Sequence, residues 1–486
     1  MSYVFEGLTP EKVWKYFHDI CQIPHPSKKE GKIIQYLIEF GKAHNLETRT
    51  DDAGNVLICK KATSGMEKKK TVVLQSHMDM VCEKNSDVQH DFEKDPIKPW
   101  IDNGWVKATG TTLGADDGIG VASALALLAS DDIAHGPIEC LFTMDEETGL
   151  TGAFALKQGF VKGKILLNLD SEDEGELFIG CAGGKGTIIE MKYKKETVPA
   201  NHAAYKISVT GLKGGHSGGD IHKGLGNAVK ILNRLLWNAA DKFGIRLSEF
   251  TGGNLHNAIA REGFANVLVP SDKSKGFEVF VTLYNKTLKE ELATVDPNLN
   301  ISFESTATPA FVIDSDTQFK LLNSLYACPH GVIAMCADIP DLVETSTNLA
   351  SVKFADDKII IGTSQRSSVE SSKHDIADMV ASVFRLTFAE IIVGDGYPGW
   401  KPNVSSEILT ITKNAYQKLF NKQPKVLAIH AGLECGIIGE TSPGMDMISF
   451  GPTLRDVHSP DERIEIATVD MFWVLMLEVL KNIPDA

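Results

Sequence analysis

The sequence lacks the features of several common protein classes. Its eight cysteines are scattered without a C-x-x-C pair, so neither a zinc knuckle nor a thioredoxin-type motif is encoded. No apolar run approaches the ~18 residues that a membrane-spanning helix needs. The first residues show no basic region followed by an apolar stretch, so no cleaved secretory signal is expected. These absences predict a cytoplasmic protein with reduced thiols that does not enter a membrane.

Positive charge is also in deficit. The chain has 49 Lys and Arg against 64 Asp and Glu, a formal net charge of −15. This acidic balance argues against a nucleic-acid or anionic-membrane surface. Small molecules, peptides and metal cations are the partners that remain.

What is present is the length and composition of a globular protein. With 486 residues, 43% of them hydrophobic, the chain is long enough for two or three domains. Its first third alternates helix and strand patterns, which predicts an α/β fold with a mixed sheet and helices on both faces. From about residue 187, strand patterns such as Tyr205–Val209 predict an α+β unit with an antiparallel sheet. We therefore expect a discontinuous catalytic domain, residues 1–186 and 393–486, with an inserted lid domain at 187–392.

Three local patterns lead to further predictions. Ser27-Lys28-Lys29-Glu30 has the form of a capping box and predicts the start of a helix. The apolar alternation in Phe277–Leu283 predicts a strand. The glycine-rich segment 180–187 fails as a phosphate-binding loop, because Gly186 stands where the motif needs Ser or Thr and the framing glycines are too close.

Side chains that can bind metals follow several predicted strands. They are His77 and Asp79 after one strand, Glu146 and Glu147 after a second, Asp170 at the end of a third, His458 in a loop after a fourth, and Asp116 in a glycine-flanked turn. Open α/β sheets build their sites outside the carboxyl ends of strands, so these groups should converge. Alone, each has an ordinary alternative as a surface histidine, a strand-end polar cluster or an acidic loop. Their joint placement favours a metal site.

The ligand chemistry indicates zinc, or a similar ion such as manganese or cobalt. The set has two histidines and an excess of carboxylates but no cysteine. A mononuclear catalytic zinc uses about three protein ligands. A carboxylate that bridges two ions would account for the excess and leave Glu146 as a base.

Six motifs in a fixed order resemble those of a known family. They are H-M-D (77–79), L-G-A-D-D (113–117), D-E-E-T-G (145–149), N-L-D-S-E (168–172), G-G-H-S-G-G (214–219) and H-A-G-L-E-C (430–435). The set resembles the dinuclear zinc peptidases related to carboxypeptidase G and aminoacylase, and within them the aminoacyl-histidine (Xaa-His) dipeptidase branch, over essentially the whole chain. The resemblance implies a metallo-dipeptidase that hydrolyses unblocked dipeptides, carnosine-like substrates included, and a homodimer formed through the lid.

The resemblance also assigns roles at the metals. It implies that one zinc is held by His77, Asp116 and Asp170, and the other by Asp116, Glu147 and His458, so that Asp116 is the bridge. Asp79 resembles the carboxylate that orients the ring of His77. Glu146 resembles the general base, which takes a proton from the metal-bridging water and passes it to the leaving amine.

Substrate contacts are implied in the same way. His216 is expected to stabilise the oxyanion, and Asn257 to contact the substrate. Arg366 is a clamp for the substrate carboxylate, with a surface arginine on a strand as the alternative. Gly432 and Glu434 line the dipeptide pocket. Glu434 is a candidate partner for the free α-amine, with a carboxylate at a helix N-terminus as its alternative.

Two other functions stay open from the sequence. One is an amidohydrolase of the same architecture that acts on N-acyl amino acids. Acceptance of a free α-amine separates it from a dipeptidase, so Glu434 is the residue to test. The other is a metal-binding or peptide-binding protein without catalysis, against which the intact Glu146 and full ligand set argue.

Overall fold

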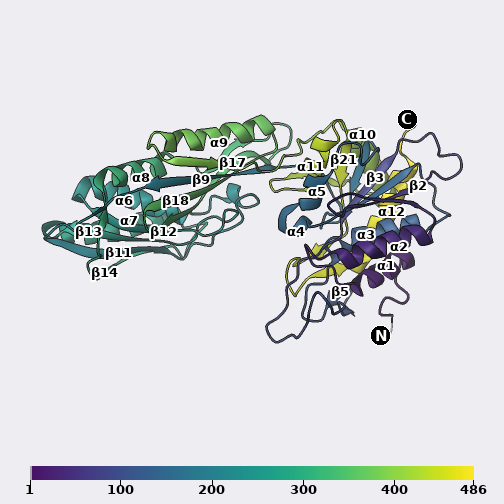
Figure 1. Ribbon diagram of the computed structural model, residues 1–486, viewed down its shortest axis with the longest axis horizontal. Coiled ribbons are helices and arrows are strands. Elements are labelled where there is room, and N and C mark those ends of the chain that lie inside the picture. Colours follow the sequence, from purple (N-terminus) through teal and green to yellow (C-terminus); the bar gives the residue numbers. More distant parts are fainter. Residues whose placement is uncertain (1–2) are drawn as a thin grey trace. The chain divides into compact units, whose positions relative to one another are not determined.

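The computed structural model describes residues 3–486, and the chain forms two compact units (Figure 1). Unit 1 comprises the chain up to Cys181, Trp400–Ala428 and Leu433–Ala486. Unit 2 comprises Ala182–Gly399 and Ile429–Gly432. Unit 2 is thus inserted into unit 1. Within residues 3–486, no helix is both long and apolar enough to cross a membrane.

Unit 1 is built on an eight-stranded sheet with the order β1-β2-β6-β3-β7-β21-β8-β20. Its strands are β1 (Glu47–Thr50), β2 (Val56–Lys60), β3 (Val72–His77), β6 (Ile138–Thr143), β7 (Ile165–Asn168), β8 (Glu176–Cys181), β20 (Lys425–Ile429) and β21 (Asp446–Ser449). The central strands β6, β3, β7 and β21 run parallel, whereas β1, β2 and β8 pair antiparallel. Strands β3 and β6 are buried along their whole length, as expected for apolar runs at the centre of a parallel sheet. The mixed α/β fold class is confirmed.

The helices of unit 1 pack on this sheet and on one another. They are α1 (Glu11–Cys21), α2 (Gly31–Ala43), α3 (Ala115–Leu128), α4 (Glu146–Gly149), α5 (Thr151–Ala155), α10 (Glu407–Phe420), α11 (Glu434–Thr441) and α12 (Ile466–Lys481). Helix α3 contacts both β3 and α1. Its small residues permit this, since a Cβ on Gly118 would already touch the ring of Phe17 at 3.4 Å. A second sheet, of order β22-β23-β5-β4, contains β4 (Pro99–Asp102), β5 (Trp105–Ala108), β22 (Leu454–Arg455) and β23 (Arg463–Glu465).

Unit 2 has a nine-stranded sheet in which every pairing of described strands is antiparallel. Its order is β14-β11-β13-β12-β17-β18-β9-β19, and β16 pairs with β17. The strands are β9 (Gly183–Lys192), β11 (His202–Thr210), β12 (Arg246–Gly252), β13 (Gly263–Pro270), β14 (Asn300–Ser305), β16 (Gly331–Met335), β17 (Val343–Phe354), β18 (Lys358–Ser367) and β19 (Glu390–Val393), with a separate pair β10 (Lys195–Glu196) and β15 (Val312–Ile313). The helices are α6 (Ala228–Phe243), α7 (Ser274–Glu291), α8 (Ser315–Ala327) and α9 (Glu370–Arg385), and the 3₁₀ turns are η1 (Ile221–Lys223) and η2 (Ser271–Lys273). The predicted antiparallel α+β unit is confirmed.

The capping box at the start of α2 was predicted wrongly. Helix α2 begins at Gly31, and Glu30 occupies the cap position without a capping bond from its side chain. The Ser27 hydroxyl instead donates to Oδ2 of Asp79 at 2.7 Å. The buried carboxylate of Asp79 needs hydrogen-bond donors, and the Ser27 hydroxyl is one of them, so it does not cap the helix.

The strand predicted at Phe277–Leu283 was also wrong, because this segment lies inside helix α7. Phe277, Val281 and Tyr284 are buried at helical spacing, whereas Val279 and Leu283 are 58% and 59% exposed. The alternation extended over too few residues to separate a period of 2 from one of 3.6.

Candidate metal and substrate site

Two groups of metal-competent side chains in unit 1 share Asp116. In each group the candidate ligand atoms lie within 4.8 Å of one another. One group consists of His77, Asp116 and Asp170, and the other consists of Asp116, Glu147 and His458. His77 ends β3, Asp170 follows β7, and Glu147 lies in α4 directly after β6. These three strands are adjacent and parallel, so the sheet itself brings their carboxyl ends together.

Asp116 is common to both groups, and its two oxygens face different histidines. His77 Nε2 lies 3.1 Å from Asp116 Oδ1, and His458 Nε2 lies 3.2 Å from Asp116 Oδ2. His77 Nε2 is also 3.4 Å from Asp170 Oδ1, and His458 Nε2 is 3.0 Å from Glu147 Oε2. This arrangement is that of a carboxylate able to bridge two cations.

The electrostatics of this cluster fit divalent cations. Burial, aided by the charge of Asp116, raises the pKa of Asp170 to about 7. Hydrogen bonds to Asp116 and Glu147 raise the pKa of His458 to about 11. Oε1 of Glu147 is buried and has no hydrogen-bond partner among the described residues. Metal ions would neutralise the crowded carboxylates and give this oxygen a partner.

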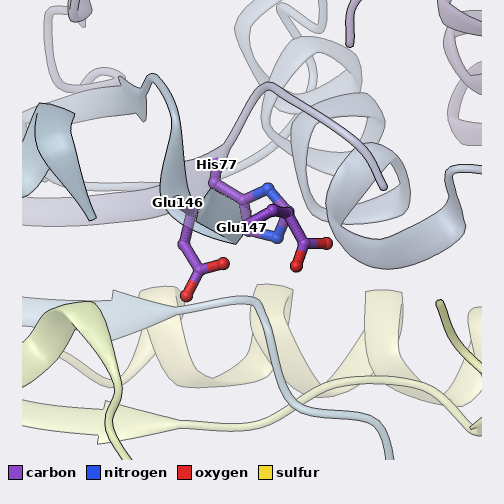
Figure 2. A group of neighbouring side chains, drawn as sticks. All are labelled: His77, Glu146 and Glu147. Carbon is purple, nitrogen blue, oxygen red and sulfur yellow. The ribbon is translucent and has the colours of Figure 1, made fainter. Parts of the chain in front are cut away.

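Asp79 contacts both the ring of His77 and the start of helix α4. Its Oδ1 lies 3.4 Å from His77 Nδ1, and its two oxygens accept the backbone N–H groups of Glu146 at 3.0 Å and Glu147 at 3.3 Å. Asp79 is 1% exposed. One buried carboxylate thus holds a candidate ligand and the start of the short helix that carries the candidate base. Figure 2 shows His77, Glu146 and Glu147 gathered at this point.

Burial raises the pKa of Glu146 well above its ordinary value, and the negative charges of Asp170 and Glu434 add to this effect. A carboxylate with a high proton affinity next to a metal cluster is suited to accept and return a proton.

Glu434, at the start of α11, is fully buried in unit 1. Its Oε2 accepts hydrogen bonds from Gln75 Nε2 at 2.6 Å and Thr143 Oγ1 at 2.7 Å, whereas its Oε1 has no partner among residues 3–486. Neither Gln75 nor Thr143 was singled out in the sequence. The available signal was a polar residue inside each of two apolar strands, because a buried polar group requires a partner.

The remaining predicted residues lie in unit 2. Nδ1 of His216 accepts the backbone N–H groups of Gly218 at 3.3 Å and Gly219 at 3.0 Å. Burial, together with the charge of Arg366, lowers the pKa of His216. The imidazole is therefore neutral with its proton on Nε2, which makes that atom a hydrogen-bond donor. Asn257 is exposed, and its backbone oxygen accepts from Ser217 N at 2.8 Å, which ties the two loops together.

Arg366, on β18, is only 7% exposed, so it is not a surface arginine. Its Nη1 donates to Tyr397 Oη at 2.9 Å, its buried Nε has no hydrogen-bond partner, and none of the described carboxylates forms an ion pair with it. A buried guanidinium without a counter-charge is costly, and an anionic ligand would remove that cost.

Two glycines pack against Tyr397, whose hydroxyl oxygen accepts the hydrogen bond from Arg366. A Cβ on Gly184 would come within 2.6 Å of the Tyr397 ring, and one on Gly432 within 2.8 Å. Gly432 is therefore required for the packing of Tyr397. Tyr397, in the turn-rich segment 394–399, was not predicted as a site residue from the sequence.

Comparison with known proteins identifies the family. The model of peptidase family M20/M25/M40 matches residues 73–482. A cytosol non-specific dipeptidase from Escherichia coli (strain K12) is 45% identical over 477 residues, which cover 98% of this chain and 98% of the relative. The crystal structure of an aminoacylhistidine dipeptidase from Vibrio alginolyticus is similar with a TM-score of 0.94 and 45% identity, over 99% of this chain and 98% of that one. Aminopeptidase PepT from Bacillus cereus, at 18% identity and a TM-score of 0.58, shares the fold. The resemblance inferred from six ordered motifs is confirmed, and the chain belongs to peptidase family M20/M25/M40.

Proposed function

We propose that this hydrolase is a dinuclear zinc dipeptidase that cleaves unblocked dipeptides, Xaa-His substrates of the carnosine type included. The observation that carries the proposal is the pair of ligand groups that share Asp116, together with the buried carboxylate of Glu434 in the same unit. Near full-length similarity to two named dipeptidases supports it.

Two zinc ions, when bound, would supply Lewis-acid activation of the carbonyl and of water. The donor set of imidazoles and carboxylates suits zinc, and also manganese or cobalt as substitutes. His77, Asp116 and Asp170 would hold one ion, and Asp116, Glu147 and His458 the other. Asp79 keeps the His77 ring in place for this role.

The protein side chains would then move the protons. Glu146 takes a proton from the attacking water and returns it to the leaving amine as the peptide bond breaks. His216 donates from Nε2–H to the oxygen that becomes negative in the tetrahedral transition state. A histidine that is neutral before the reaction, with its tautomer fixed by two backbone amides, needs no reorganisation to do so.

Recognition of both charged ends of the substrate would limit its length. Oε1 of Glu434 is the acceptor that we assign to the free α-amine, and Arg366 the donor that pairs with the α-carboxylate. Asn257 and Gly432 are further substrate contacts in this proposal. An N-acyl amino acid would leave Oε1 of Glu434 buried without a hydrogen-bond partner, which disfavours the amidohydrolase alternative.

The test is elemental analysis combined with hydrolysis of carnosine, Gly-His, Ala-Ala, a tripeptide and N-acetyl-methionine. We expect about two metal ions per chain and cleavage of the dipeptides alone. For Glu434→Gln we expect kcat/KM on dipeptides to fall about 10- to 100-fold with the metal content unchanged. Cleavage of N-acetyl-methionine would move the protein to the amidohydrolases, and a metal-loaded but inert protein would be a binding protein.

We propose in addition that the protein is cytosolic, as the name of the Escherichia coli relative indicates for that protein, and that it dimerises through unit 2. Exposed aromatic side chains on unit 2 support the dimer. Phe319 and Tyr326 on α8 are 69% and 45% exposed, and Trp237 on α6 contacts Tyr326 with ring centroids 4.9 Å apart. Sedimentation equilibrium of the wild type and of Phe319→Glu tests this, since a dimer formed here should dissociate in the variant.

A further inference from the structure

A glutamate outside the predicted site connects two of the segments that carry candidate ligands. Glu462 follows His458 by four residues and is 2% exposed. Its Oε2 accepts the backbone N–H groups of Leu113 at 2.6 Å and Gly114 at 3.0 Å, and its Oε1 those of Ala115 at 2.8 Å and Asp116 at 3.3 Å. Four consecutive amides therefore depend on one carboxylate.

Among residues 3–486, these four amides have no hydrogen-bond acceptor other than Glu462. They precede or begin helix α3, where N–H groups have no partner within the helix. Leu113 and Ala115 are buried, so water does not replace the carboxylate. Gly114 has a φ of +71°, and this left-handed residue allows the neighbouring amides to converge on one anion.

The loop that carries His458 and Glu462 leads into a strand of the small sheet of unit 1. Strand β23, which starts directly after Glu462, pairs with β5, with Arg463 opposite Lys107. Strand β5 in turn leads into the turn that carries Asp116. Glu462 adds a second link between the same two segments, because its carboxylate binds the turn that carries Asp116.

We propose that Glu462 is a positioning residue for the metal site, which holds the turn of Asp116 and the loop of His458 in the spacing that two ions require. Its carboxylate touches neither substrate nor metal in this role. Glu462 acts on the group formed by Asp116, Glu147 and His458 more than on the group around His77, since His77 and Asp170 are held by other strands. The inference rests on the proposed dinuclear site.

The test is the substitution Glu462→Gln, followed by titration of the metal-free protein with Zn²⁺ in a calorimeter. Glutamine keeps one oxygen but presents an NH₂ group to the second pair of amides, so the turn loses half of its acceptors. We expect the affinity for one of the two ions to fall at least tenfold. Elemental analysis should then find about one ion per chain at a zinc concentration that gives two in the wild type.

A matched control separates positioning from general stability. Glu139, on β6, is 5% exposed, and its Oε2 likewise accepts two backbone amides, those of Lys162 at 2.7 Å and Gly163 at 2.9 Å. Glu139→Gln should lower the melting temperature of the metal-free protein without a change in zinc affinity. Glu462→Gln should instead reduce the rise in melting temperature that zinc produces.

The outcomes are distinguishable. Wild-type zinc affinity at both sites in Glu462→Gln would overturn this inference alone, as would an equal loss of affinity in Glu139→Gln. A wild-type protein that binds no zinc would overturn the proposed function, and this inference with it. If Glu462→Gln does not fold, the same titration of Glu462→Asp, which retains both oxygens on a shorter side chain, decides the question.

Discussion

Glu146 and Glu147 are adjacent residues with different surroundings. We therefore expect the same substitution to impair proton transfer at Glu146 and metal binding at Glu147. Glu147 lies 3.0 Å from His458, whereas burial raises the pKa of Glu146 well above its usual range. Glu146→Gln should retain two ions and lower kcat by about 10²- to 10⁴-fold, since only proton transfer is lost. Glu147→Gln should instead lose one ion. Elemental analysis and kinetics on Gly-His distinguish the two, and loss of metal in Glu146→Gln would contradict the assigned roles.

The hydrogen bond from Arg366 to Tyr397 predicts an effect on substrate affinity. Tyr397→Phe removes the acceptor and leaves the ring between its glycines, so Arg366 should become less ordered. We expect KM for dipeptides to rise about fivefold to tenfold, with a smaller change in kcat, because one intramolecular hydrogen bond contributes about 0.5–1.5 kcal/mol. Tyr193→Phe is the control, since that hydroxyl donates to Ala355 O elsewhere in unit 2. An equal KM effect in both variants would refute the role.

At this scale the sequence could predict residue types but not their partners. His77, Asp116, Glu147, Asp170 and His458 were recognisable, because imidazoles and carboxylates that follow strands form a pattern along the chain. Partners brought from distant segments leave no such pattern. Gln75 beside Glu434, Tyr397 beside Arg366 and Glu462 beside the turn of Asp116 became visible only in the folded chain.

Among the elements, prediction succeeded where a hydrophobic period was long or its residues were uniformly apolar. The segment Tyr205–Val209, predicted as a strand from its pattern, lies within β11 (His202–Thr210). Part of helix α7, Phe277–Leu283, was instead predicted as a strand, because the exposed Val279 and Leu283 complete an apolar alternation over these seven residues. Tertiary packing on Phe277 and Val281 decided its structure.

The end of helix α8 gives a pH-dependent prediction. Lys230 donates to the carbonyls of Leu325, Tyr326 and Cys328 at the end of α8. Burial, and then the charge of Lys230, lowers the pKa of the adjacent His330 to about 4. The unfolded chain, with a histidine pKa near 6.5, binds this proton first. Stability is therefore full above pH 6.5 and decreases as the pH falls toward 4.

His330→Gln should remove this dependence, because glutamine can still accept the N–H of Leu349 but does not titrate. Between pH 7.5 and pH 5 the variant should lose up to about 2 kcal/mol less stability than the wild type. Urea unfolding at the two pH values measures this difference. His374→Gln is the control, since that side chain is 53% exposed on α9. Equal acid sensitivity of His330→Gln and the wild type would show that His330 is protonated in the folded state.

At the scale of the whole molecule, every candidate metal ligand belongs to unit 1, although the chain leaves this unit for some two hundred residues between Asp170 and His458. An ion that binds only folded unit 1 stabilises it by an amount that grows with ion concentration, about 2.7 kcal/mol at one hundred times the dissociation constant. Unit 2 offers none of these ligands and has its own hydrophobic core.

This separation predicts where metal removal acts. In hydrogen exchange of the wild type with zinc and with a chelator, the amides of β3 and of the start of α3 should exchange faster without metal, whereas those of β11 and β13 should not change. The two strands can be compared because β3 and β11 each pair with a neighbouring strand on both sides. Faster exchange of β11 to the same degree would mean that the two units unfold as one, and the stability of the antiparallel sheet would then depend on ions that its own residues do not bind.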